Sequence, residues 1–151
     1  MAHGKMLVAT TIILSFTVIA LVLTAYAAIN VSVSINSSGS IAVSPNIGVY
    51  SDSACTVPLT TINWGSPSPG STVNQTVYIK NTQGSTSLTL SMTTSNWNPT
   101  SANGSLTVTW NQQGIVLAPG QSAAATLTLN VSSNITGITT FSVQISISGT
   151  G

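Results

Sequence analysis

Side chains able to carry out acid–base, nucleophilic or metal chemistry are very few in this chain. Asp52 is its only acidic side chain, His3 its only histidine and Cys55 its only cysteine, and the basic side chains are Lys5 and Lys80. Paired carboxylates, a Ser-His-Asp or Cys-His arrangement and a metal cluster each need two or more such groups together. The sequence therefore predicts that the protein is not an enzyme and uses no metal or cofactor.

The single cysteine, Cys55, cannot form a disulfide within the chain. We expect it to be a small buried side chain, which is the usual role of a free cysteine. An intersubunit disulfide or a reactive thiol is the alternative.

The polar residues of the chain are hydroxyls and amides rather than ions. Charged residues make up 2% of the chain, against a usual ~25%, while serine and threonine together number 47. No basic patch is present to meet phosphates, which excludes nucleic acid as a partner. A net charge near +1 gives little repulsion between copies, so the composition favours a subunit that associates or is covered by glycans, and disfavours a cytoplasmic enzyme.

A membrane-length apolar segment precedes everything else. It runs from Met6 to Ala28 without a charge or a proline. As an α-helix it would be roughly 35 Å long, enough to cross a hydrocarbon core of ~30 Å. Lys5 is the only charge ahead of it, which places the N-terminus inside and the bulk of the chain outside. The apolar side chains expected to pack in lipid or in an assembled core are Ile12, Ile13, Leu14, Phe16, Val18, Ile19, Leu21, Val22 and Leu23.

Three fates are open for this segment: a permanent anchor, the assembly helix of a filament, or a secretory signal that is removed. The sequence Ala25-Tyr26-Ala27 offers a small-x-small cleavage site, although the apolar run is longer than the usual ~7 to 15 residues. Hydroxyl side chains within the run suit close helix-to-helix packing, which favours an anchor or an assembly helix. These hydroxyls are Thr10, Thr11, Ser15 and Thr17.

After Ala28 the pattern changes to short alternating segments. About eight strands at roughly 8 to 12 residue spacing, with no helical period, predict an all-β immunoglobulin-like sandwich. The full prediction is thus an N-terminal hydrophobic α-helix within a leader and helix region of residues 1–28, followed by an immunoglobulin-like β-sandwich over 29–151. Asn36 to Gly39 is expected to form a turn, and Ser40 to Val43 a short strand.

The two longest strands are predicted near the C-terminus from strict alternation. Their inward residues are Ala123, Ala125, Leu127, Leu129 and Val131 in one, and Phe141, Val143, Ile145 and Ile147 in the other. Trp64, Trp97 and Trp110 are expected to pack in the core. An exposed aromatic binding strip is the alternative for these tryptophans.

Six Asn-x-Ser/Thr sequons provide candidate glycosylation sites. They begin at Asn30, Asn36, Asn74, Asn103, Asn130 and Asn134. Alternation places Asn74 and Asn130 on outward strand faces, whereas Asn36, Asn103 and Asn134 are expected in turns. Both settings leave room for a sugar, so N-linked glycans are expected partners. The alternative is that these asparagines are ordinary polar strand residues without glycans.

A short positive leader, an unbroken apolar segment and a Ser/Thr-rich immunoglobulin-like domain together resemble an archaeal type IV pilin. The resemblance covers the whole chain as an architecture. It implies a homopolymer, held in the membrane before assembly, whose helices pack into the filament core while the β domains form a glycosylated extracellular sheath at the cell surface. Adhesion is a usual role of such filaments.

A second resemblance, to TasA-type and archaeal bundling-pilus subunits, rests on Ser68-Pro69-Gly70-Ser71 to Asn81-Thr82 and on Leu117-Ala118-Pro119-Gly120. It implies that residues up to about 27 are cleaved and that a following strand is donated to a neighbouring subunit. The donated side chains would be Ile29, Val31, Val33 and Ile35. A third possibility is a membrane-anchored surface or envelope protein that does not polymerise.

Overall fold

The computed structural model describes residues 35–151, in which segments of period-two alternation form nine strands. The strands are β1 (Asn36–Val43), β2 (Ile47–Tyr50), β3 (Thr61–Gly65), β4 (Thr72–Asn81), β5 (Leu88–Asn98), β6 (Leu106–Trp110), β7 (Val116–Leu117), β8 (Ser122–Val131) and β9 (Thr140–Thr150). A single 3-10 turn, η1 (Thr100–Ala102), lies between β5 and β6.

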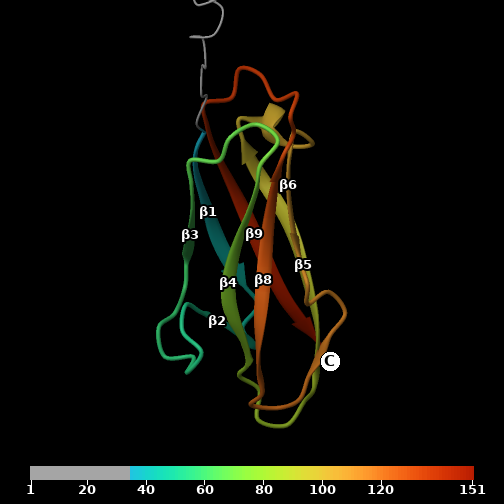
Figure 1. Ribbon diagram of the computed structural model, residues 1–151. Helices are drawn as coiled ribbons and strands as arrows, with labels where there is room; N and C mark the ends of the chain where they lie inside the picture. Colours follow the sequence, from blue (N-terminus) through green and yellow to red (C-terminus); the bar gives the residue numbers. More distant parts are fainter. Residues whose placement is uncertain (1–34) are drawn as a thin grey trace, which may run out of the picture. The chain divides into compact units, whose positions relative to one another are not determined.

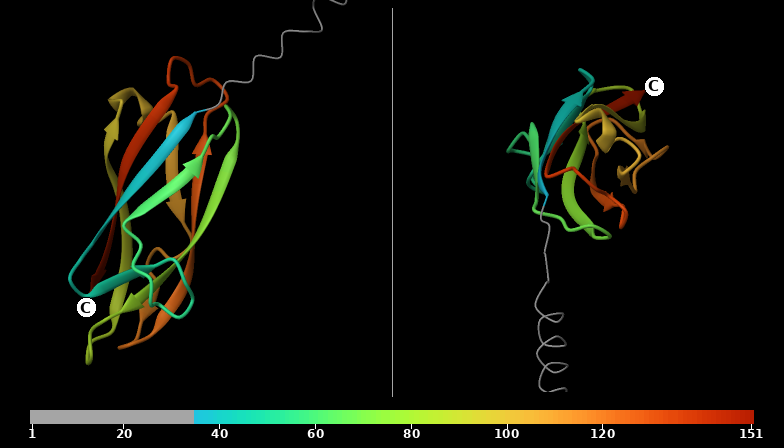
Figure 2. Two further views of the ribbon diagram at one scale, coloured as in Figure 1. Left: turned by 90° about the vertical axis from the view of Figure 1, so that its left-hand side faces the viewer. Right: turned by 90° about the horizontal axis from the view of Figure 1, so that it is seen from above.

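The strands form two sheets that face each other (Figure 1; Figure 2). A five-stranded sheet has the order β3-β1-β9-β5-β7, and a four-stranded sheet has the order β2-β4-β8-β6. All odd-numbered strands therefore lie in one sheet and all even-numbered strands in the other. Neighbours pair antiparallel except β1 and β9, which are parallel over eight residue pairs.

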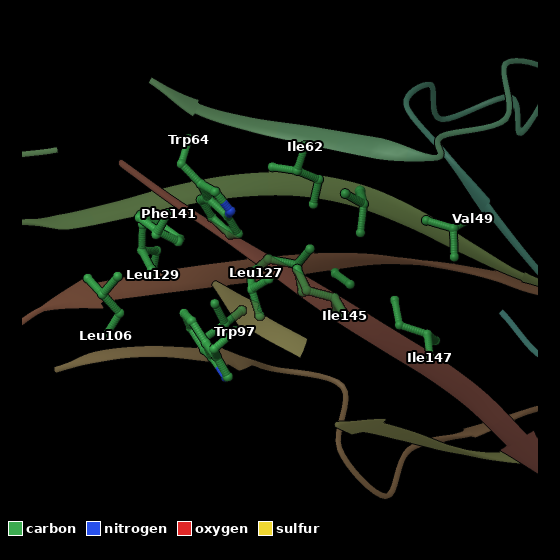
Figure 3. Packing of buried hydrophobic residues seen from close by; sticks show 14 of the residues in the cluster. Val49, Ile62, Trp64, Trp97, Leu106, Leu127, Leu129, Phe141, Ile145 and Ile147 are labelled. Atoms are coloured by element: carbon green, nitrogen blue, oxygen red, sulfur yellow. The ribbon is translucent and has the colours of Figure 1, made fainter. Parts of the chain in front are cut away.

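The core fills the space between the sheets (Figure 3). The inward residues predicted for β8 and β9 are confirmed, since all except the half-buried Ala123 are buried. Trp64 and Trp97 are buried as predicted, and the ring centroid of Trp97 lies 6.0 Å from that of Phe141. Trp110 is half-buried against the core, and its indole N–H donates to Gln113 Oε1 at 2.9 Å.

The predicted fold class, a helix followed by an immunoglobulin-like sandwich, is wrong. Residues 35–151 form an all-β fold with no α-helix, because apolar positions there repeat every two residues rather than every 3.6. The helix predicted within residues 1–28 lies outside the described residues. The connectivity also differs, since immunoglobulin sheets pair some consecutive strands, whereas here every connection crosses to the opposite sheet.

The turn predicted at Asn36 to Gly39 is also wrong, because these residues form the first half of β1. Their Asn, Ser and Gly composition favours a turn, but β1 lies between two strands and forms ladders with both β3 and β9. The backbone pairing on two sides overrides the local preference. Trp97 belongs to β5 and lies beyond a bulge at which Asn96 adopts φ 52°.

Candidate functional site

The carboxylate of Asp52 forms its hydrogen bonds within its own loop. Asp52 Oδ1 accepts from the Val57 N–H at 2.8 Å and the Thr56 N–H at 3.0 Å, and Oδ2 accepts from Thr56 Oγ1 at 2.7 Å. The Val57 N–H first, and then the Thr56 hydroxyl, lower the pKa of the Asp52 carboxyl. A carboxylate held in this way closes the loop before β3 and is poorly suited to taking up a proton.

The thiol lies in the same loop. Cys55 has a left-handed φ of 55° and is a free, half-buried cysteine, so the prediction of a buried core residue is wrong. The turn around Asp52 places Cys55 outside the packed layers, which the spacing of apolar residues could not show. Within residues 35–151, no three His, Cys, Asp or Glu side chains come together in a way that could hold a metal ion.

Two sequon asparagines lie side by side on the outer face of the four-stranded sheet. The Thr128 hydroxyl donates to Asn74 Oδ1 at 2.9 Å, and the Thr72 hydroxyl donates to Asn130 Oδ1 at 3.0 Å. Because Thr72 pairs with Asn130 and Asn74 with Thr128, the two asparagines are diagonal neighbours. Each keeps its amide nitrogen, the atom that a glycan would modify, on the outward face as predicted.

The remaining sequons differ in their settings. Asn103 and Asn134 are exposed in loops, as expected. Asn36, predicted in a turn, is instead the first residue of β1, and its Oδ1 accepts from Ser66 Oγ at 3.1 Å. Asn30 lies outside the described residues.

The apolar residues expected to assemble, from Ile12 to Leu23, also lie outside the described residues, as do Ile29, Val31 and Val33. Ile35 is fully buried in the sandwich, and its N–H donates to the Pro67 carbonyl at 3.0 Å. Within residues 35–151 there is no helix with the length and apolarity needed to cross a membrane.

A hollow of about 380 Å³ opens at one end of the four-stranded sheet, and sequence analysis did not predict it. The turns 82–87 and 118–121, which form two of its walls, lie together at the lower end of the molecule in Figure 1. Its lining residues are Tyr50, Lys80, Asn81, Thr82, Gln83, Gly84, Pro119 and Gly120.

Aromatic and cationic side chains meet at this hollow. The β2–β4 ladder pairs Gly48 with Lys80 and Tyr50 with Tyr78, so all four residues share the outer face. Alternation within β4 places Tyr78 and Lys80 on one face, but the sequence carries no signal that pairs β2 with β4. β2 and β4 are neighbours because every connection between consecutive strands crosses to the opposite sheet, and local sequence patterns do not show this crossing.

A second, larger hollow of about 490 Å³ lies on the outer face of the five-stranded sheet. It is lined only by small, hydroxyl or amide residues and one valine, with no aromatic ring and no charge. It therefore offers fewer distinct contacts to a ligand than the hollow beside Tyr50 and Lys80.

No protein-family model matches the chain, and neither a curated protein nor a solved structure shows significant similarity to it.

Proposed function

We propose that the chain is a structural subunit of an extracellular, cell-surface filament, which assembles through its N-terminal apolar segment and carries the β-sandwich outside. One observation supports this most strongly: the described sandwich exposes hydroxyls and amides, and Asp52 and Lys80 are its only charged side chains. Such a surface gives little mutual repulsion between copies. The segment that precedes the sandwich in the sequence, Met6 to Ala28, is apolar enough for lipid or for a packed filament core.

Glycans complete this proposal. Four exposed or outward sequons, at Asn74, Asn103, Asn130 and Asn134, lie on the described domain, where sugars would supply the hydration that charges normally provide. Intact-mass measurement of cell-surface material tests this directly. Mass increments that disappear in asparagine-to-glutamine variants would support glycosylation, and an unmodified mass would remove glycans from the proposal.

The experiment for the filament itself is electron microscopy of cells that express the chain with Leu14→Asp. A carboxylate buried without a partner in lipid or in a packed apolar core costs roughly 3 kcal/mol or more, so filaments should vanish. Leu14→Ile is the matched control and should assemble normally. Abundant filaments containing the Asp variant would contradict assembly through this segment.

A second candidate, a filament joined by strand donation, is favoured by one specific observation. β1 occupies a slot between β3 and β9, yet its core-facing positions include the small Ser37 and Gly39. Gly39 lies beside Trp64, whose buried indole N–H has no partner among the described residues. Residues 29–34 alternate apolar and polar more regularly and could fill such a slot in a neighbouring subunit. The prediction that Ile35 is donated with them is wrong, because Ile35 is buried in the sandwich of its own chain.

The mature N-terminus, determined by mass spectrometry of surface material, separates the alternatives. A start near Met6 supports assembly through the apolar segment, and a start near Ala28 supports strand donation. An intact N-terminus without filaments would instead support a membrane-anchored protein that does not polymerise.

A further inference from the structure

The hollow beside β2 is lined by the aromatic ring of Tyr50, which has room there because residue 48 is a glycine. A Cβ atom on Gly48 would come within 2.5 Å of Tyr50 Cε2 and of the Tyr50 hydroxyl oxygen. The edge of the Tyr50 ring and its hydroxyl therefore lie over Gly48, and a larger residue at position 48 would displace them. Tyr50 also lines the hollow, so a face of its ring can contact a flat apolar partner there, such as the C–H face of a sugar.

A cation lies beside this ring. Lys80 is opposite Gly48 in the ladder and lines the hollow. The only acidic side chain of the chain, Asp52, is bound by Thr56 and Val57 of its own loop, and Lys80 forms no ion pair within residues 35–151. An anionic group entering the hollow would therefore meet an ammonium group that no neighbouring carboxylate neutralises.

The walls of the hollow are fixed by a buried amide. Asn81 is fully buried, and its Nδ2 donates to the carbonyls of Thr86 at 2.8 Å and Leu117 at 3.0 Å. Its Oδ1 accepts from the Gln83 N–H at 2.9 Å, and its own N–H donates to the Gln121 carbonyl at 2.9 Å. Both turns are thus tied to one residue, through its side chain and its backbone N–H, so the hollow exists before a ligand arrives and little ordering is needed on binding.

We propose that this hollow binds a saccharide that carries a carboxylate, such as a uronic acid residue. Tyr50 would contact the sugar ring, Lys80 its carboxylate, and the polar groups of Thr82 and Gln83 its hydroxyls. The volume lies within the ~300 to 1,000 Å³ usual for ligand sites. The same chemistry is found in a free acidic polysaccharide and in an acidic glycan on another copy of the chain. The proposal does not depend on filament assembly.

The test is calorimetric titration of the full chain, in mild detergent and made without glycans, with trigalacturonate and with its trimethyl ester. We expect saturable binding of both, with the acid about tenfold tighter because the ester lacks the charge. Lys80→Gln should lower affinity for the acid to that of the ester, whereas Lys80→Arg should retain the difference. Tyr50→Leu should abolish binding of both ligands, and Tyr50→Phe should keep most of it.

Circular dichroism and thermal unfolding of each variant show whether it is folded, so a loss of binding can be assigned to the site. Absence of saturable binding by the folded protein would overturn the proposal. So would binding of trigalacturonate by Tyr50→Leu and Lys80→Gln that is as tight as binding by the unchanged chain. The two sources are then distinguished with glycosylated chain. Self-association that trigalacturonate disperses identifies a glycan of another copy as ligand, whereas binding without self-association identifies a free polysaccharide.

Discussion

β9 and β1 are neighbours in one sheet, and they are held there in different ways. Over eight paired residues, β9 presents Phe141 and three aliphatic side chains to the core, all of them buried. The paired positions of β1 are Ser37, Gly39, Ile41 and Val43, of which Ile41 is half-buried and Val43 is 46% exposed. β9 is therefore stabilised mainly by side-chain packing, and β1 mainly by backbone pairing on both of its sides.

The difference between β9 and β1 shows which strands of a sandwich can be recognised from the sequence alone. Side-chain alternation is visible along the chain, whereas backbone pairing becomes visible only when the neighbouring strands are known. A strand that depends on its neighbours can consist of residues that favour turns, as the first half of β1 does. Four predictions test this contrast, and stability is measured on the full chain in detergent, by chemical unfolding for the substitutions and also by thermal unfolding for the effect of pH.

The largest effect is expected for a cavity under β9. Ile145 is fully buried and is paired with Ile41 across the two strands. Ile145→Ala should lower the free energy of unfolding by about 4 kcal/mol, because the transfer and cavity terms both apply in full. Ile41→Ala, the same deletion in the half-buried partner, should cost only about 1 kcal/mol. Equal losses would show that β1 also depends on packing, and the contrast would be wrong.

The backbone contribution of β1 is measured by Ile41→Pro. The Ile41 N–H donates to the Thr60 carbonyl at 2.8 Å, and proline removes this donor while its ring disturbs the ladder. We expect a loss of about 3 kcal/mol, several times that of Ile41→Ala. The alanine variant is the matched control, since it removes most of the same side chain. Similar values for the proline and alanine variants would mean that the pairing contributes little.

The two longest strands near the C-terminus could be predicted from the sequence, since their apolar positions alternate and the inward faces of β8 and β9 are confirmed. The pairing of strands could not, because no local pattern states that each connection crosses to the other sheet. The outward positions of Asn74 in β4 and Asn130 in β8 each followed from the alternation within its own strand. The hollow did not follow, because it needs the meeting of β2 with β4 and the buried contacts of Asn81, which are properties of the assembled fold.

A smaller effect is expected where β1 meets the indole of Trp64. A Cβ on Gly39 would lie 3.2 Å from Trp64 Nε1 and 3.5 Å from Ile145 Cδ1, so Gly39→Ala is tight but feasible. Trp64 Nε1–H is a buried donor without a partner among residues 35–151, and a serine hydroxyl at position 39 could accept from it. We expect Gly39→Ser to be more stable than Gly39→Ala by about 1 kcal/mol. Equal stability would show that this N–H is already satisfied.

The smallest effect on stability is expected when the pH is lowered from 7 to 2. Neither β1 nor β9 contains an ionisable side chain, so the difference between Ile145→Ala and Ile41→Ala should be the same at pH 2 and pH 7. Asp52 is the only acidic side chain of the chain, and its pKa is lowered by the Val57 N–H and the Thr56 hydroxyl. Its contribution to stability is therefore complete above the unfolded pKa of about 3.9 and is lost as the pH falls through the lower folded value.

The loss therefore occurs below about pH 4, and it is limited because Asp52 is only partly buried and is the single acidic side chain of the chain. We expect the Tm of the unchanged chain to fall between pH 7 and pH 2 by less than Ile41→Ala lowers it at pH 7. Asp52→Asn should remove most of this dependence, because an amide does not titrate. A larger fall that persists in Asp52→Asn would mean that groups other than this carboxylate control stability in acid, and β1 and β9 would then need to be compared at each pH separately.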